Sequence, residues 1–587
     1  MFARFRPIRP YLARYNKRFV VGFACLTAGQ SIGAVVGLVI KAGIDDLNDL
    51  NLRTHGVLLR QLAIVAGLLV GISLVKSVFQ FWARWILIGI SRDAEYDLRN
   101  DLFRHLLRLS PRYYTEHRTG DLMSKLTNDL TAVRNMIGPG IMYSASTVVT
   151  CVTSIGLMIH LDWKLTLMAL APLPLVSITV KYFGDKIHER FEKIQALYSE
   201  LTERVRENIS GVRVIRAFRQ EHAEMATFDV MNLDMVKKNR GLIWISSFLW
   251  PAMGLMYAIA IMMVLVMGGL HVVKGMITVG TFTAFNWYLL NLIWPIIALG
   301  YVTNLVQRGL ASQGRLMSIF DSKPDIDDRE VPADAPTALV GGIEFRNLSF
   351  SYNGHAILKN INLHIPAGKT VAVVGATGSG KSTLVSLIPR LYDAPPGTLL
   401  IDGVPIRQIP LQTLRKYIGF VPQETFLFSE TIGENIKLGA PQASDAQVQR
   451  AAEISNILPE INSFPKKFDT MVGERGLTLS GGQKQRTAIS RAVIRDPRIL
   501  ILDDALSSVD TYTEETILRQ LTGVLAGRTT ILISHRVSTI QNADEIVVLY
   551  DGEIAERGTH AELLAMNGHY TALYNKQLIE EALEKEA

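Results

Sequence analysis

A glycine-rich run in the second half of the sequence has the spacing of a phosphate-binding loop. The apolar run 369–374 is typical of a strand, and it leads directly into Gly375-Ala-Thr-Gly-Ser-Gly-Lys-Ser-Thr383. This is the complete pattern of two glycines with four residues between them, followed by lysine and a hydroxyl residue, in its required strand–loop–helix context. Glycines let the backbone turn tightly so that its N–H groups converge on phosphate oxygens, and the start of the next helix adds further donors. We expect nucleotide binding by Gly375, Ala376, Thr377, Gly378, Ser379, Gly380, Lys381, Ser382 and Thr383.

Two carboxylates follow a second apolar strand. The run 499–502 (Ile-Leu-Ile-Leu) ends in Asp503, and Asp504 comes next. In phosphate-loop proteins a carboxylate at the end of such a strand holds Mg²⁺ together with the loop hydroxyl, here Ser382, while the loop lysine neutralises phosphate charge. Asp504 lies where a general base or a water-positioning carboxylate would be. A strand ending in Asp is a weak signal alone, but after a complete phosphate loop it predicts ATP and Mg²⁺ as cofactors.

The elements that must position these residues belong to the second of two very different halves. After about residue 340, short Val/Ile/Leu runs alternate with Gly-rich turns and helical segments, which predicts a parallel α/β domain. Before about residue 310, long apolar stretches alternate with charged, helical ones. The stretch 321–342 carries three prolines and several acids, and we expect it to be a linker between a transmembrane domain (1–320) and a nucleotide-binding domain (343–587).

The first half is predicted to cross a membrane six times. A spanning helix needs about 20 mostly apolar residues, and the candidates are 19–41, 57–90, 138–160, 164–182, 241–267 and 278–302. Of the 587 residues 48% are hydrophobic and 20% are charged, a composition that excludes disorder and argues against a wholly soluble enzyme. The two cysteines exclude a disulfide framework. The expected fold is therefore an all-α six-helix transmembrane domain with long cytoplasmic extensions, followed by an α/β P-loop domain.

Charge gives the orientation of the chain. The net charge is +7, and six basic residues and no acid lie in residues 1–18. The positive-inside rule places this end in the cytoplasm, while Asp45, Asp46 and Asp49 in the first loop suit the outside. The basic N-terminus could alternatively bind nucleic acid, but a membrane span follows it directly, so no nucleic-acid partner is expected. With no targeting peptide in view, a bacterial inner membrane is the expected location.

Two polar stretches, 91–137 and 183–240, separate the spans and have helical patterns. Leucines recur at helical spacing near residues 98–109, and Pro111 is predicted to end that helix just before Tyr113. Residues 187–205 carry an apolar seam with alternating spacings of four and three, which is typical of coiled coils. Each stretch is predicted to be a pair of helices that extends the neighbouring spans into the cytoplasm. Solvated loops are the alternative interpretation.

Four residues of the spans are candidates for a substrate cavity. Lys76 and Arg84 interrupt the second span, and ionisable residues within spans usually face protein or a water-filled cavity. They would suit an anionic substrate, or they could lie near the membrane surface. Trp287 and Asn291 belong to an aromatic and amide-rich stretch of the last span, which could contact amphipathic molecules or serve packing alone.

The run Leu479-Ser480-Gly481-Gly482-Gln483 resembles the signature of the ATP-binding cassette (ABC) family. The resemblance implies that this signature contacts the γ-phosphate of ATP held by a partner cassette. It also implies roles for further residues that match family motifs one by one. These are Tyr352 on adenine, Gln423 toward Mg²⁺ and the attacking water, Val472–Gly476 before the signature, Asp510 in the D-loop, and His535 on the γ-phosphate.

The order of six spans and then a cassette is similar to exporter half-transporters of the multidrug and lipid type. The resemblance implies a dimer that exports amphipathic compounds, with membrane lipids around it and coupling elements near 111–119 and 208–218. A lipid or glycolipid flippase on the same scaffold is the alternative. An ATP-driven regulator or channel would need a gating or regulatory segment that is not visible.

Asp504 departs from the family pattern, in which Glu is common at this position. Asp is shorter by one methylene, which holds its carboxylate back by roughly 1.5 Å, and a displacement of about 1 Å can slow catalysis about 10²-fold. The substitution resembles the impaired subunit of heterodimeric bacterial multidrug exporters. We therefore expect a heterodimer, with a slow homodimer as the alternative.

Overall fold

The computed structural model describes residues 6–49, 55–352, 354–473, 476, 478–509, 511–525 and 527–586. The chain forms two compact units. The first comprises Met1–Leu106 and Gly120–Asp321, and the second comprises Leu107–Thr119 and Ser322–Ala587. Each unit is described by itself.

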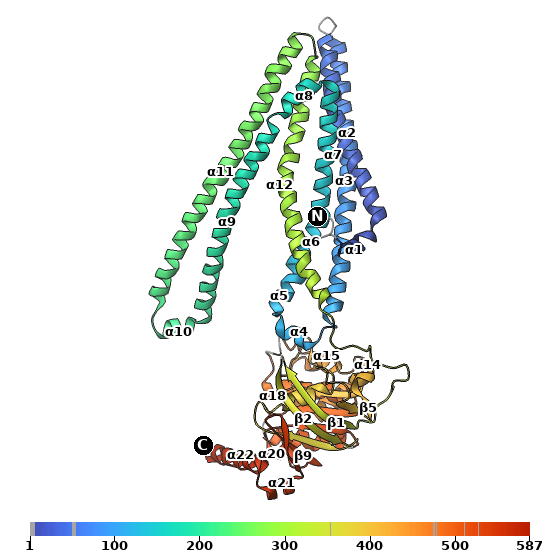
Figure 1. Cartoon of the computed structure of the whole chain (residues 1–587), viewed down its shortest axis with the longest axis vertical. Helices are drawn as coiled ribbons and strands as arrows, with labels where there is room; N and C mark the ends of the chain where they lie inside the picture. Colours follow the sequence, from blue (N-terminus) through green and yellow to red (C-terminus); the bar gives the residue numbers. More distant parts are fainter. Residues whose placement is uncertain are drawn as a thin grey trace. The chain divides into compact units, whose positions relative to one another are not determined.

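The first unit is helical in all its described elements, as the apolar stretches predict (Figure 1). Its helices are α1 (Arg9–Ala13), α2 (Asn16–Asp49), α3 (His55–Leu106), α5 (Thr119–Ser124), α6 (Leu130–Asn135), α7 (Ile141–Leu161), α8 (Trp163–Leu170), α9 (Leu173–Ser210), α10 (Val212–Ala217), α11 (Glu221–Val273) and α12 (Val279–Asp321), with π-helical turns η2 (Lys125–Asp129) and η3 (Met136–Gly140).

Within the described residues, five helical segments are long and apolar enough to cross a membrane: Asn16–Leu47, Leu59–Leu106, Thr119–Leu161, Glu221–Val273 and Val279–Asp321. They match five of the six predicted spans, two of which (57–90 and 278–302) begin one or two residues before the corresponding segment. The remaining span, 164–182, is the fourth along the chain, and a turn at Ala171 and Pro172 divides it between α8 and α9. Proline lacks an N–H and restricts the preceding residue, so the helix is interrupted there.

The charged extensions are helical, as predicted. Helices α9 and α11 contact each other over much of their length, and α10 joins their ends (Figure 1). The prediction for Pro111 was wrong. Helix α3 ends at Leu106, and Pro111 instead begins the next helix, α4 (Pro111–Glu116). At the first position of a helix the missing N–H of proline is not needed.

Hydrogen bonds and apolar packing hold the first unit together. The buried side chains of Met158, Leu165, Val264 and Phe285 form one apolar cluster with Tyr288. The Tyr288 hydroxyl donates to the carbonyl of Ala34 at 3.0 Å, which ties α12 to α2.

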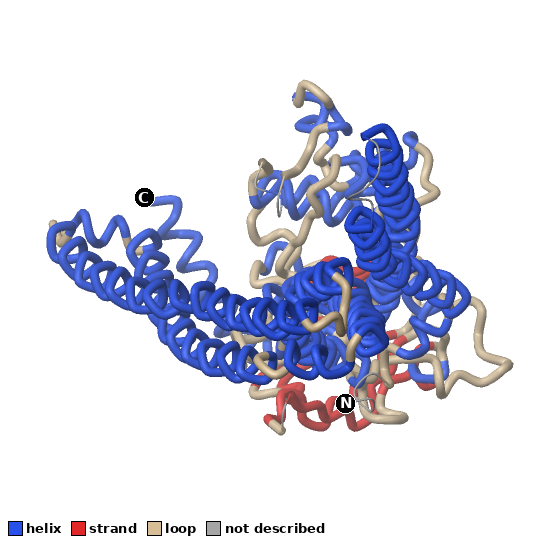
Figure 2. The backbone as a smooth tube through the Cα atoms, turned by 90° about the horizontal axis from the view of Figure 1, so that it is seen from above, coloured by secondary structure: helices blue, strands red, loops and turns tan. Residues whose placement is uncertain are grey.

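All the strands that the structure describes belong to the second unit, and they are red in Figure 2. A six-stranded sheet has the order β10-β9-β3-β8-β7-β6, and its pairs are parallel except for β10 with β9. Its strands are β3 (Thr370–Val374), β6 (Ile418–Val421), β7 (Ile499–Asp503), β8 (Thr529–Ile533), β9 (Glu545–Tyr550) and β10 (Glu553–Gly558). A smaller antiparallel sheet contains β1 (Ile343–Tyr352), β2 (His355–Ile365), β4 (Leu399–Ile401) and β5 (Val404–Pro405) in the order β2-β1-β4-β5.

Helices flank these sheets. They are α13 (Lys381–Leu387), α14 (Leu411–Lys416), α15 (Ile432–Lys437), α16 (Asp445–Ile454), α17 (Leu458–Ser463), α18 (Gly481–Val493), α19 (Thr511–Leu525), α20 (Val537–Ile540), α21 (His560–Met566) and α22 (His569–Glu586), together with α4. Every residue of β7 and β8 is buried, as expected for central parallel strands covered on both faces. Because β3, β7 and β8 run parallel, their carboxyl ends meet at one edge of the sheet.

Candidate nucleotide site

A cavity of about 280 Å³ lies where the carboxyl ends of β3, β7 and β8 meet. This is the edge at which ligands bind in open parallel sheets. Eleven residues predicted from the sequence line it: Tyr352, Thr377, Gly378, Gly380, Lys381, Ser382, Thr383, Gln423, Asp503, Asp504 and His535. The structure therefore brings together segments that are up to 183 positions apart in the chain.

The backbone of the loop 375–380 needs its glycines. Gly375, Gly378 and Gly380 have φ values of +150°, +85° and +98°, which residues with a side chain rarely adopt. A Cβ at Gly375 would overlap the carbonyl oxygen of Leu549, while a Cβ at Gly378 would meet nothing within 4 Å. The loop thus packs closely against the sheet at one end and leaves open space beside the cavity.

One atom of this loop lacks a partner. The hydroxyl of Ser379 is buried and has no hydrogen-bond partner among the described residues. Buried polar groups in folded proteins are nearly always paired. Ser379 does not line the cavity, whereas Gly378, Lys381 and Ser382 do, and these loop residues are the ones that fit the phosphates of a bound nucleotide.

Lys381 is the first residue of α13, and its side chain folds back over the loop. Its ammonium group donates to the carbonyls of Gly375 at 2.8 Å and Ala376 at 2.9 Å. Burial lowers the pKa of Lys381, and the nearby carboxylates of Asp503 and Asp504 oppose that shift. An anion entering the cavity would therefore meet a cation already held beside the loop.

Ser382 and Asp503 are paired. The Ser382 hydroxyl donates to Asp503 Oδ1 at 3.1 Å, and burial raises the pKa of Asp503. Groups of three or more His, Cys, Asp or Glu side chains that could hold a metal are absent from the described part of the chain. A hydroxyl and one carboxylate still fit Mg²⁺, which is usually bound through one or two carboxylates, water and substrate phosphates.

Asp504 has an unusual backbone conformation. Its φ is +48°, in the left-handed region, and its N–H donates to the carbonyl of Ile533 at 2.9 Å. Few residues other than glycine adopt this conformation, and Asp and Asn are the most tolerant of them. The backbone therefore favours Asp here for a local reason that was not visible in the sequence.

Tyr352 belongs to an aromatic cluster. Its ring centroid lies 5.0 Å from that of Phe350 and 5.1 Å from that of Tyr392, both nearly edge-to-face. Tyr352 also lines a second cavity, of about 550 Å³, with Tyr392 and residues of α4. The sequence analysis missed Tyr392, which no motif marks.

The signature residues form a helix start rather than part of this cavity. The Ser480 hydroxyl accepts from the Gln483 N–H at 3.3 Å, and the Gln483 side chain accepts from the Ser480 N–H at 3.0 Å. A Cβ at Gly481 or Gly482 would approach Ser508 to 3.2 or 3.0 Å, and Leu479 is buried. Among the described residues, no signature residue lines the cavity of its own chain.

The structure describes only part of the predicted D-loop. Asp510 lies outside the described residues. The preceding residues Ser507 and Ser508 are both held by Gln485, which donates to the Ser507 hydroxyl and accepts from the Ser508 N–H, each at 2.9 Å. Gln485 was missed, although it lies only two residues after the signature and is buried.

The four predicted cavity residues of the spans have separate surroundings. Lys76 lies against Gly33 of α2, and Arg84 lines a small cavity of about 50 Å³. The Trp287 ring nitrogen is buried without a partner among the described residues, and the Asn291 side chain donates to the carbonyl of Trp287 at 3.0 Å.

Comparisons with known proteins give the family. Residues 19–296 match the ABC transporter transmembrane region, and residues 358–507 match the ABC transporter domain. The chain is 38% identical to the probable multidrug resistance ABC transporter ATP-binding/permease protein YheI of Bacillus subtilis (strain 168), over 98% of each chain. It is 36% identical to the ATP-dependent lipid A-core flippase of Syntrophus aciditrophicus (strain SB), over 98% of this chain and 95% of that protein.

Two further relatives agree. The multidrug resistance-like ATP-binding protein MdlA of Escherichia coli (strain K12) is 35% identical over 98% of this chain and 96% of that protein. The solved structure of a bacterial Atm1-family ABC exporter with ATP bound superimposes with a TM-score of 0.79 at 28% identity, covering 96% of this chain and 99% of that one. The chain therefore belongs to the ABC transporter family, and it is a multi-pass membrane exporter subunit that hydrolyses ATP.

Proposed function

We propose that this chain is one half of a dimeric exporter that moves amphipathic or hydrophobic compounds outward across a bacterial inner membrane. The observation that carries the proposal is the cavity where the phosphate loop, Asp503, Asp504, Gln423 and His535 meet. The names of two relatives, which refer to multidrug resistance, support the substrate class.

The loop binds the phosphates of ATP. The Lys381 ammonium leaves the carbonyls of Gly375 and Ala376 and pairs with the β and γ phosphates. The backbone of the loop, including Ser379, surrounds the phosphates, and Tyr352 stacks on adenine. Loop glycines matter because N–H groups must approach the phosphates without side chains between them.

Ser382, Asp503 and Gln423 are the residues that would hold Mg²⁺. When bound, the ion neutralises negative charge that develops on the phosphates during transfer. Asp503 would hold the ion in its ionised form, which burial disfavours and which the Ser382 hydroxyl and the nearby Lys381 favour.

Asp504 and His535 act on the water and the γ-phosphate. Asp504 orients the attacking water and accepts its proton, and His535 donates a hydrogen bond to the γ-phosphate. Because the Asp504 carboxylate is shorter than the usual Glu, this site hydrolyses slowly. The signature of this chain then completes a faster site on a different partner, which makes a heterodimer the favoured assembly.

Two short helices serve as coupling elements. Helix α4 is connected to the linker through the Ser110 hydroxyl, which donates to Asp325 at 2.9 Å, and it shares a cavity with Tyr352. Motion at the adenine can therefore reach α4. Helix α10 joins the ends of α9 and α11 and is the second candidate.

A lipid or glycolipid flippase is the second candidate function. Two observations favour it: a lipid A-core flippase is among the relatives, and Arg84 lines a small cavity with Gln30, Gln80 and Ser146. An anionic head group would pair with that guanidinium.

ATPase measurements in liposomes separate the two functions. The reconstituted full chain, with its partner if one is encoded beside it, is tested with neutral aromatic compounds and with lipids that differ only in head group. Stimulation and uptake of the compounds, independent of head group, support export. Stimulation only by anionic head groups, lost in Arg84→Gln, would replace the main proposal by the flippase.

A further inference from the structure

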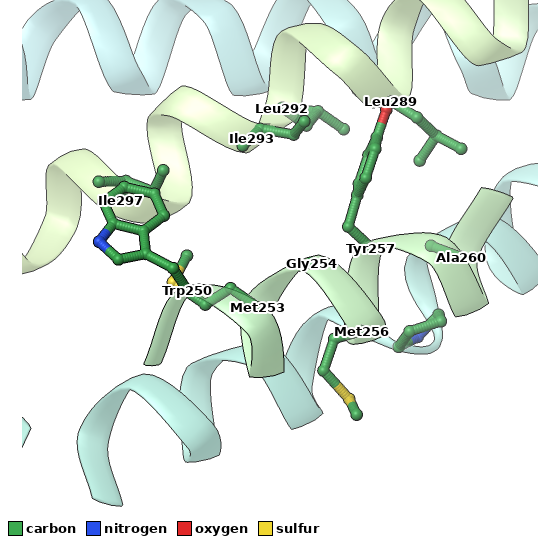
Figure 3. Close-up of a pocket in the computed structure, with 11 residues that line it drawn as sticks. Trp250, Met253, Gly254, Met256, Tyr257, Ala260, Leu289, Leu292, Ile293 and Ile297 are labelled. Carbon is green, nitrogen blue, oxygen red and sulfur yellow. The ribbon is translucent and has the colours of Figure 1, made fainter. Parts of the chain in front are cut away.

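A further cavity, of about 180 Å³, lies within the membrane half between α11 and α12 (Figure 3). It is distinct from the small polar cavity that contains Arg84. Its lining residues are Pro172, Trp250, Met253, Gly254, Met256, Tyr257, Ala260, Leu289, Leu292, Ile293 and Ile297.

Two features show that the cavity has space for a guest. A Cβ at Gly254 would meet nothing within 4 Å, so the wall is open at this residue. The Tyr257 ring projects from α11 toward α12 (Figure 3), and Trp250 of α11 and Ile297 of α12 also line the cavity. Flat aromatic faces from one helix and branched aliphatic side chains from the other thus border the cavity.

Tyr257 supplies the polar group. Its hydroxyl is buried and has no hydrogen-bond partner among the described residues. Buried tyrosine hydroxyls usually find a partner. The Tyr288 hydroxyl, on the neighbouring helix, does so with the carbonyl of Ala34. The Tyr257 hydroxyl is therefore available to a guest that carries an acceptor.

The lining residues indicate that the bound molecule is uncharged. No charged side chain is among the eleven lining residues, and an ion would lose its hydration without gaining a partner. Pockets that enclose a drug-sized ligand measure about 300–1,000 Å³, whereas an engineered cavity of about 150 Å³ takes up benzene. This cavity has room for a ring system rather than for a whole large molecule.

From these observations we infer that the cavity binds the uncharged aromatic end of a transported compound, with Tyr257 donating a hydrogen bond to an acceptor on that ring system. The inference rests on the proposed export function and names the substrate class. Met253 and Met256 suit such a guest because thioethers make favourable contacts with ring edges. A lipid acyl chain could fill the space, but it would leave the Tyr257 hydroxyl unpaired.

Benzophenone is a suitable probe because it has two rings, no charge and one carbonyl acceptor. On irradiation its carbonyl abstracts a hydrogen atom from a nearby C–H group, and the two carbon radicals join. The full chain is irradiated in nanodiscs at increasing benzophenone concentrations, and the modified residues are mapped by mass spectrometry. We expect saturable labelling centred on Met253 and Met256.

Matched variants test the site. Gly254→Leu fills the space and should reduce labelling at both methionines at least tenfold. Gly269→Leu, at another open position of α11 outside the cavity, should leave it unchanged. Tyr257→Phe should raise the half-saturating concentration about two- to tenfold, the range for one hydrogen bond, whereas Tyr301→Phe should not. Thermal midpoints check that each variant is folded.

The results separate this inference from the proposed function. Labelling spread evenly along the membrane-facing helices, or unaffected by Gly254→Leu, would overturn the site, as would a lack of saturation. If neutral compounds are still transported normally by the Gly254→Leu and Tyr257→Phe variants, the site is wrong but the export function stands. If the wild-type chain transports no compound of this class while benzophenone still saturates the site, the proposed function fails and the cavity remains a binding site.

Discussion

The side chain of Lys381 is placed to pair with the phosphates of ATP. Among the described residues its ammonium group donates hydrogen bonds to two loop carbonyls, and two carboxylates lie close enough to stabilise its charge. We expect Lys381→Ala to lower the ATPase rate by at least about 10²–10³-fold, the usual loss when a preorganised charge in a catalytic site is removed. Steady-state phosphate release measures this.

Lys369→Ala is the matched control. Lys369 directly precedes β3, the strand that leads into the phosphate loop, and its ammonium group pairs with Asp544 at 2.9 Å on the surface. Its loss should leave hydrolysis within about twofold, because exposed pairs contribute little. Equal losses in the two variants would remove the assignment of Lys381 to the phosphates.

Asp504 combines two opposing requirements. Asp504→Glu should raise kcat when the chain is tested alone, because it restores reach toward the water. It should also lower the stability of the nucleotide domain by up to about 1 kcal/mol, since Glu lacks the local hydrogen bonding that lets Asp adopt a left-handed φ. ATPase assays and thermal unfolding measure the two effects separately.

Asp504→Asn is the complementary variant. It keeps the backbone preference and removes the carboxylate, so stability should be retained while hydrolysis is lost. Vigorous hydrolysis by the wild-type chain alone, unimproved by Glu, would instead show that Asp504 positions the water well by itself. That result would count against a heterodimer.

For individual residues, the sequence predicted which side chains lie together in the nucleotide cavity but not which neighbouring side chains position them. The spacing of the phosphate loop and the strand end at Asp503 requires them to share one edge of the sheet. The partnership of Tyr392 with Tyr352, and of Gln485 with Ser507, depends on side-chain packing between distant segments. No local pattern encodes such contacts.

Asp45 joins two helices that are far apart in the sequence. Its carboxylate accepts from the Gly280 N–H at 2.9 Å and from the Thr278 hydroxyl at 2.9 Å, and it pairs with Lys41 at 3.1 Å. It thereby satisfies free donors at the start of α12. We expect Asp45→Ala to destabilise the membrane half by about 1.5–3 kcal/mol, the range for hydrogen bonds to a charged group.

Asp46→Ala controls for the charge change. Asp46 is the next residue, is exposed, and should tolerate the substitution. Thermal unfolding in detergent compares the two variants. Equal midpoints would show that the contacts of Asp45 contribute nothing measurable.

The C-terminal helix α22 positions the segment that follows His535. The Gln577 side chain accepts from the Val537 N–H at 2.7 Å, at the start of α20. Gln577 and His535 also line one cavity of about 130 Å³. We expect Gln577→Ala to lower kcat about two- to tenfold with little change in KM, since it loosens a residue that acts on the transition state.

Asn575→Ala provides the comparison in the same helix, because Asn575 is exposed. Full ATP titrations of both variants give kcat and KM. A rise in KM alone for Gln577→Ala would mean that α22 supports nucleotide binding instead.

Element boundaries were predictable where composition changes sharply and less so at prolines. The apolar stretches gave α2, α3, α11 and α12 because length and hydropathy suffice to define a span. Pro111 and Pro172 each lie at a helix start, where proline is favoured. The sequence alone does not show on which side of a proline the chain turns.

The seam predicted on residues 187–205 is only half covered within one chain. Ile194 and Leu201 are buried, whereas Phe191 and Tyr198 are 45% and 57% exposed. Large apolar side chains gathered on one exposed face mark an interaction surface. Because exporters of this family act as dimers, the uncovered side of α9 is expected to be covered by the second half-transporter.

Tyr198 provides the test at the scale of the assembly. Tyr198→Glu places a charge on the exposed side of α9, where burial against a partner would remove it from water, which is unfavourable for an unpaired charge. We expect the dimer fraction, measured by native mass spectrometry, to fall at least tenfold. ATPase activity should fall with it, because each nucleotide cavity lacks a signature from its own chain.

Ser199→Glu introduces the same charge at the neighbouring polar and exposed residue, and it should leave both quantities nearly unchanged. Activity that survives in a monomeric Tyr198→Glu variant would mean that one chain completes its own site. Dimers that persist in this variant would mean that α9 keeps its exposed face in the assembly and that the subunits meet elsewhere.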